Sequence, residues 1–184
     1  MGKIPKQYYL QDNGNFPNSC LPVLHYRNIL NLPFFFPALS IKKLFRKNGW
    51  TNTWKDGLSI HYHYHSITHE VLGIYKGRTI LQLGGNEGIE IVLKKGDVLI
   101  IPAGVAHRNM GNKKDVLCVG AYPDGRHFDM NYGRTSERPR TDRNIASLSV
   151  PSCDPIFGEN KGVTKIWRRS FSVKPPRINL NVVS

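Results

Sequence analysis

The chain has 184 residues, enough for one domain with a hydrophobic core of its own. Its three cysteines, Cys20, Cys118 and Cys153, are an odd number without a C-x-x-C pair, which argues against a disulfide framework and for reduced thiols in a cytoplasmic protein. The net charge is +13, but lysine and arginine occur in small separate groups rather than in one stripe, so no specific nucleic-acid partner is expected.

No segment of the sequence predicts insertion into a membrane. The most apolar stretch, Leu32–Leu39, is too short to span a bilayer and contains two prolines. The first ten residues carry charge but no apolar run of the kind found in signal peptides. We therefore expect no membrane partner and a cytoplasmic location.

Residues 1–56 are predicted to form an N-terminal extension of the domain. Turn-forming residues dominate its start, and a short strand is expected over Leu21–Tyr26. A helix is predicted at about residues 37–48, because Pro37 suits a first helical turn and Asn48-Gly49 suits a C-terminal stop. The apolar residues of this helix share one face, and its basic residues lie mostly on another: Ala38, Ile41, Leu44 and Phe45 against Lys42, Lys43, Arg46 and Lys47.

Residues 57–123 show short strands separated by tight turns. Two of these strands, 79–83 and 89–93, flank a glycine-rich loop at 84–88 and read as a hairpin. Val98–Ile101 is a continuous apolar run that suits a strand buried on both faces, and 116–122 is the next strand. This spacing predicts an all-β jelly-roll barrel. Residues 124–184 are expected to add strands and a basic tail within the same single domain.

Histidine placement is the most informative feature of the barrel segment. His61, His63 and His65 alternate with tyrosines, so on a strand their rings would project from one face. Glu70 has the opposite parity to His65, so the chain must turn between them before the carboxylate can point back toward the imidazoles. A third imidazole, from His107, would enter from a distant strand. Three imidazoles and one carboxylate can supply four ligands to one divalent cation.

The residues around these histidines resemble the two motifs of the cupin superfamily. The first motif, G-x5-H-x-H-x(3,4)-E-x6-G, is filled at every fixed position by Gly57, His63, His65, Glu70 and Gly77. The second, G-x5-P-x-G-x2-H-x3-N, is matched by Gly96, Pro102, Gly104 and His107. It departs from the pattern at its last position, where Gly111 stands and Asn112 follows one place later.

Beyond the two motifs, the chain is similar to the small single-domain cupins of the YjlB-like group. The segments that carry this wider resemblance are 65–73, Gly120–Pro123, and Asp154-Pro155 with a late Trp167. The resemblance implies a cupin jelly roll and a metal held by His63, His65, Glu70 and His107. His69, in the turn before Glu70, is a competing ligand if that turn is tighter than the motif implies.

Several other residues are candidates for the pocket. His61 continues the histidine row, either as a proton donor or substrate contact or as a partly exposed strand residue. Tyr122 ends the strand after His107 and is expected near the pocket mouth, as are Arg126 and His127, although a turn of this composition is more often only a turn. The tryptophans Trp50, Trp54 and Trp167 are predicted to pack the terminal segments onto the barrel.

The sequence predicts a metal more firmly than a reaction. Three imidazoles and a carboxylate suit Fe, Mn, Co, Ni, Zn or Cu as a divalent ion. The leading hypothesis is a metal-dependent enzyme acting on a small molecule, with dioxygenase-type chemistry favoured because an open iron site suits oxygen. The alternatives are a non-enzymatic cupin that binds or senses a small molecule, and a sugar isomerase or epimerase.

The terminal segments predict an assembly. Apolar residues occur beyond the barrel at both ends, and Ile178–Val182 alternates apolar and polar residues as a half-buried strand would. Since jelly rolls leave strand edges unpaired, we expect a homodimer in which the terminal segments cover a sheet edge, with a monomer bearing a disordered basic tail as the alternative.

Overall fold

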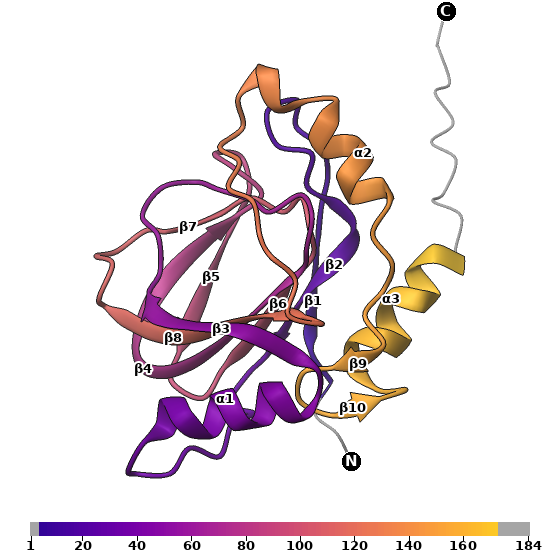
Figure 1. The fold of residues 1–184 in the computed structure, drawn as a ribbon. Coiled ribbons are helices and arrows are strands. Elements are labelled where there is room, and N and C mark those ends of the chain that lie inside the picture. Colours follow the sequence, from indigo (N-terminus) through magenta and orange to yellow (C-terminus); the bar gives the residue numbers. More distant parts are fainter. Residues whose placement is uncertain (1–3, 173–184) are drawn as a thin grey trace, which may run out of the picture.

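One long strand, β4 (Glu70–Leu83), runs through both sheets of the barrel in the computed structural model, which describes residues 4–172. Its first half lies between β6 (Val98–Ile101) and β8 (Val116–Pro123), and its second half pairs with β5 (Ile89–Lys94) and β7 (His107–Asn109). An irregularity between Ile74 and Lys76 separates the two halves. The strand therefore joins the two layers of the barrel (Figure 1).

The remaining strands extend the first sheet to both sides. The order in this sheet is β1-β2-β6-β4-β8-β3, so β1 and β3 are its outermost strands. Their bounds are Lys6–Leu10 for β1, Ser19–Tyr26 for β2 and Trp50–Gly57 for β3. The strands predicted at 21–26, 79–83, 89–93, 98–101 and 116–122 and the 84–88 hairpin are confirmed, whereas β1 and β3 lie in segments for which no strand was expected.

Two hydrophobic cores lie on opposite faces of the first sheet. Alternate residues of β4 separate them, because Leu72 belongs to the core inside the barrel and Val71 to the core outside it. The outer core includes Phe45 and Trp167, which come from two helices packed on the sheet. Trp50 is also fully buried there, so its predicted packing role and that of Trp167 are confirmed.

Helix α1 (Pro37–Lys47) matches the predicted helix and covers the outer face of the sheet. Its buried side chains are Ile41 and Phe45. A Cβ at Gly73 of β4 would lie 2.7 Å from Ile41 Cγ2 and 2.9 Å from Phe45 Cζ. Glycine at this position therefore lets the helix approach the strand closely.

The C-terminal third differs from the prediction, since residues 124–172 form mainly helices and loops. The elements are the 3₁₀ turn η1 (Thr135–Glu137), α2 (Arg140–Ala146), a two-stranded ribbon of β9 (Cys153–Asp154) and β10 (Gly158–Glu159), and α3 (Gly162–Ser172). Strands were expected over this part of the chain, and only the short β9–β10 ribbon provides them. Val163, Ile166 and Trp167 have helical spacing and mark α3 in the sequence, and Trp167 Nε1 donates to Pro22 O of β2 at 2.9 Å.

Three expectations from the sequence concern features other than the barrel. The strand expected at 178–182 lies outside the described residues, so the homodimer stays a prediction. All three cysteines are free thiols. No helix between residues 4 and 172 is both long and apolar enough to cross a membrane.

Candidate functional site

His63 and His65 enter the barrel from an irregular segment rather than from the regular strand that their alternation predicted. Only isolated bridges, His63 to His107 and Tyr64 to Asn131, tie this segment to its neighbours. The alternation nevertheless holds, because the two histidines are buried at the same site while Tyr64 packs edge-on against Phe16 in a separate cluster. The sequence pattern therefore predicted the side-chain directions correctly and the strand itself incorrectly.

His107 is the first residue of β7, which pairs with the second half of β4, and its ring lies beside those of His63 and His65. Its ring centroid lies 4.3 Å from that of His63 and 6.2 Å from that of His65. The rings of His63 and His65 are 5.6 Å apart. Three imidazoles that come from positions up to 44 residues apart in the sequence therefore share one buried site.

Each of the three imidazoles hydrogen-bonds through Nδ1 to a backbone carbonyl. The distances are 3.1 Å from His63 to His61 O, 2.5 Å from His65 to Asp129 O, and 3.1 Å from His107 to Val105 O. A carbonyl oxygen only accepts, so Nδ1 carries the proton in each ring and Nε2 presents a lone pair in the neutral form. His65 Nε2 is buried without a hydrogen-bond partner among the described residues.

Glu70, the first residue of β4, faces these Nε2 atoms. Its Oε2 lies 3.5 Å from His65 Nε2 and 3.6 Å from His107 Nε2, distances too long for strong hydrogen bonds. Its other oxygen, Oε1, accepts a 3.0 Å hydrogen bond from the hydroxyl of Tyr122. The carboxylate is thus oriented with one oxygen toward the imidazoles, as the turn expected before Glu70 requires.

Tyr122 is held in turn by Trp54, whose Nε1 donates to the Tyr122 hydroxyl oxygen at 3.0 Å. Gly120 permits this arrangement, since a Cβ there would lie 2.1 Å from the Trp54 ring. Trp54 therefore has a role beyond the packing that the sequence suggested. The proton of the Tyr122 hydroxyl is engaged by Glu70, which makes Tyr122 a positioning residue for the carboxylate.

Burial and charge act in opposite directions on the ionisable groups of the site. Burial alone would raise the pKa of Glu70, but the nearby histidines, His65 above all, lower it to about 2. Burial lowers the pKa of His107 to about 3 and also lowers that of His63. Burial is the largest single effect on His65 and lowers its pKa, but Glu70 and Asp129 together outweigh it, so the pKa of His65 is raised. The lowered pKa values keep His63 and His107 neutral beside the ionised Glu70 carboxylate, an arrangement that favours a cation.

The loop after β8 holds the His65 ring through contacts from Phe128 and Asp129. The Asp129 carboxylate accepts hydrogen bonds from Ser66 N at 2.7 Å, Ser66 Oγ at 2.5 Å and Asn131 Nδ2 at 2.7 Å, while its carbonyl accepts from His65 Nδ1. The Phe128 ring lies 5.2 Å from the His65 ring and stacks on Tyr122 at 5.0 Å. Sequence reasoning did not identify this support, because 64 positions separate His65 from Asp129.

His61 lies at the rim of the site and not inside it. Its side chain is exposed, and its backbone carbonyl accepts from His63 Nδ1. Together with His63 and His107 it borders a cavity of about 660 Å³. The cavity is lined mainly by the end of β3 and the segment after it, with Glu70, Leu72, His107 and Lys113 completing it.

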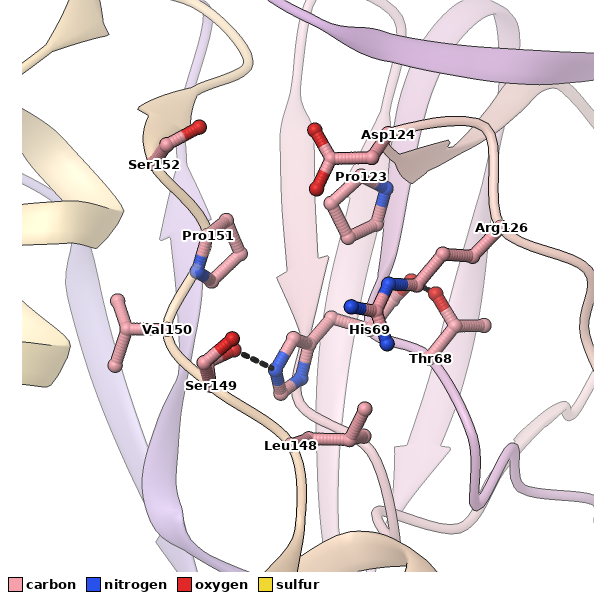
Figure 2. Close-up of a pocket in the computed structure, with 10 residues that line it drawn as sticks. All are labelled: Thr68, His69, Pro123, Asp124, Arg126, Leu148, Ser149, Val150, Pro151 and Ser152. Atoms are coloured by element: carbon pink, nitrogen blue, oxygen red, sulfur yellow. Dashed lines mark hydrogen bonds between the residues drawn. The ribbon is translucent and has the colours of Figure 1, made fainter.

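His69 lies outside this site, so its proposed competition with Glu70 as a ligand is not supported. Its Nδ1 accepts from Ala103 N at 3.0 Å, and its Nε2 lies 3.4 Å from Ser149 O. Figure 2 shows His69 and Arg126 in a separate pocket, which residues 148–152 also line. Arg126 therefore borders a different cavity, and His127 is exposed and does not line the histidine cavity.

As they stand, no three His, Cys, Asp or Glu side chains within residues 4–172 are gathered tightly enough to define a metal site. What the structure shows is a convergence of four groups that can act as ligands: Nε2 of His65 and of His107 face Glu70 Oε2, and the His63 ring lies 4.3 Å from that of His107.

Similarity to known proteins supports the cupin assignment. The model of the cupin domain family matches residues 50–119. The uncharacterized protein YjlB of Bacillus subtilis is 33% identical over 168 residues, which cover 91% of this chain and 99% of that protein.

Similar solved structures include acireductone dioxygenase from Bacillus anthracis with cadmium in its active centre, at 19% identity and a TM-score of 0.40 over 54% of this chain and 77% of that one. Oxalate decarboxylase from Bacillus subtilis, with Mn(II) centres, is 22% identical with a TM-score of 0.32 over 44% of this chain and 22% of that one. Likenesses this weak carry no information about the reaction. On the family match and the YjlB relationship, the chain belongs to the YjlB-like cupins.

Proposed function

We propose that this cupin holds one divalent transition metal through His63, His65, Glu70 and His107 and acts on a small molecule. The observation that carries the proposal is the set of three Nδ1–H···O=C hydrogen bonds, which leaves three Nε2 atoms available beside a carboxylate. Metal-binding histidines characteristically donate their second ring N–H to such an acceptor, which sets the tautomer and the ring orientation.

The spacing of the donor atoms supports the ligand set. Atoms that each lie about 2.1 Å from a shared ion are roughly 3 to 4 Å from one another. The Nε2 to Oε2 distances of 3.5 and 3.6 Å fall in this range. A cation would also provide the partner that buried His65 Nε2 lacks among the described residues.

The cavity above the site suits a small ligand. Its volume of about 660 Å³ lies within the range of about 300–1,000 Å³ that is common for ligand pockets. Trp54, Leu58, Ile60 and Leu72 contribute apolar walls, and His61 and Lys113 contribute polar groups at the rim. A bound molecule would thus meet polar groups at the rim and at the base, where Glu70 and His107 lie.

When bound, a metal at these four residues would act as a Lewis acid or as an oxygen-activating centre. Trp54 and Tyr122 hold Glu70 in its orientation, and Phe128 with Asp129 holds His65. His61 is the group placed to exchange protons with a ligand in the cavity, because it is exposed at the rim. Among metal-dependent reactions we favour the dioxygenase type, since four protein ligands leave two positions open on an octahedral ion.

Oxygen uptake tests this function. Protein reconstituted with Fe(II) is expected to consume oxygen with one member of a panel of small carboxylic acids and sugars, whereas protein reconstituted with Zn(II) is not. His61→Gln is expected to retain the metal and lower the rate, because the change lies at the rim. If no member of the panel promotes uptake but one raises the melting temperature, the dioxygenase proposal fails and the binding or sensing alternative replaces it.

Asp129→Ala is expected to weaken metal binding without removing a ligand. The change removes the acceptor of the Ser66 and Asn131 hydrogen bonds and frees the loop whose carbonyl orients His65. Loss of such an outer partner lowers metal affinity by about 10- to 100-fold. Competition with a chelator measures the affinity, and Asp124→Ala, on the exposed part of the same loop, is the matched control. Equal affinity in both variants would contradict the supporting role.

A further inference from the structure

We propose that residues 34–47 form a docking surface for anionic phospholipid headgroups. We call this surface the Phe-Lys face, and it consists of Phe34, Phe35 and Phe36 with the exposed side of α1. It lies outside the histidine cavity and does not depend on the function proposed for that cavity.

Three consecutive phenylalanines are exposed to solvent in this face. Phe34 is 91% exposed, Phe35 73% and Phe36 76%. Single exposed apolar residues are ordinary on protein surfaces, but adjacent large ones usually mark a contact site. Phe36 also has a φ of 55°, a left-handed conformation that is rare for a bulky residue. The backbone thus holds the phenylalanines outward at the start of α1.

The exposed side of α1 carries positive charge next to the three phenylalanines. Leu39, Lys43, Arg46 and Lys47 are its exposed residues, and their spacing of three to four positions places them along one stripe. The helix has 11 residues and so extends about 16 Å. The stripe is apolar beside the phenylalanines and basic toward the C-terminal end.

Acidic residues are absent from a long part of the sequence around this face. Residues 13–55 contain six lysines and arginines and no aspartate or glutamate. None of the basic residues of α1 forms an ion pair with another residue that the structure describes. Asp124 and Glu159 lie beyond the C-terminal end of the helix, where Asp124 N donates to Gly49 O and Gly158 approaches Asn48.

None of residues 4–172 covers this face. In Figure 1 the loop before α1 and the helix itself form the lower margin of the molecule, away from α2. The buried side of α1 packs on the barrel through Ile41 and Phe45, so the helix is anchored while its other side faces outward.

An anionic lipid surface is the partner that combines the two properties of the face. Aromatic side chains are favoured at the interface between headgroups and acyl chains, and basic side chains are attracted to anionic lipids. The expectation of no membrane partner was based on Leu32–Leu39, which is too short to span a bilayer. Binding at the membrane surface does not require a spanning segment, so that argument does not apply to this contact. The face also gives part of the high net charge a function.

Cosedimentation of the full chain with vesicles tests this proposal. We expect binding to phosphatidylcholine vesicles that contain phosphatidylserine, little binding to phosphatidylcholine alone, and loss of binding as salt rises. Lys43→Gln with Arg46→Gln is expected to lower partitioning at least about tenfold, since each basic residue near an anionic membrane contributes on the order of a fivefold gain. Phe34→Ser with Phe35→Ser is expected to lower it by a similar factor.

Two control variants keep the test specific. Lys94→Gln with Lys95→Gln removes the same charge from the end of β5 and the turn after it, and Ile4→Ser removes an exposed apolar side chain elsewhere; both are expected to bind like the wild type. Equal loss in the lysine control and in the α1 variant would reject a localised face. Absence of vesicle binding would overturn the lipid proposal. Conversion of a dimer into a monomer by the phenylalanine change would also overturn it and would assign the face to a second copy of the chain.

Discussion

Replacement of His65 by alanine is expected to remove nearly all bound metal from the purified protein. The wild type should hold close to one ion per chain, and the variant should bind at least about a hundredfold more weakly, because even outer partners of metal ligands change affinity by up to about that factor. The variant keeps His63, Glu70 and His107 but loses the imidazole whose Nε2 lies 3.5 Å from the carboxylate. Element analysis of protein purified without chelators measures the effect.

His69→Gln is the matched control for this experiment. His69 is a buried histidine one position before Glu70, yet both of its nitrogens face backbone groups outside the site. Its replacement should leave the metal content largely intact. Full metal content in a His65→Ala, His107→Ala double variant would show that the assigned ligands are wrong.

The stability of the metal-free protein is expected to fall as the pH drops from about 6.5 toward 4, and His69 is expected to account for a separable part of the loss. Burial lowers the pKa of His69 to about 4, so the folded state binds fewer protons than the unfolded state in this window. Stability therefore rises with pH across the window and is fully present above it. Lowering the pKa of His69 from 6.5 to about 4 corresponds to about 3 kcal/mol.

Urea unfolding at several pH values, with a chelator present, measures this contribution. His63 and His107 also have lowered pKa values and act in the same direction, so the informative quantity is the difference between wild type and His69→Gln. The variant should show a flatter dependence of unfolding free energy on pH, by about 3 kcal/mol over the window. Parallel curves for the two proteins would mean that His69 is not held neutral by its environment.

Local sequence signals were sufficient to predict the barrel and the inward direction of the candidate ligands. Helix α1, the β4–β5 hairpin and the buried strand β6 each follow from residue spacing over short distances. The alternation of His63 and His65 and the opposite parity of Glu70 predicted which side chains point inward. These features are predictable because they depend on side chains within a few positions of one another.

Contacts between distant segments were decided only by the tertiary structure. Nothing near His65 in the sequence indicates that Asp129 accepts its Nδ1 proton, and nothing near Trp54 indicates that it orients Tyr122 across a strand pair. Likewise, the sequence did not indicate that Phe34–Phe36 are exposed. The structure shows this, because neither of the two cores includes them. Residue type and spacing therefore determined the candidate ligands, whereas long-range packing determined what supports them and which apolar residues remain outside, because burial depends on the whole fold.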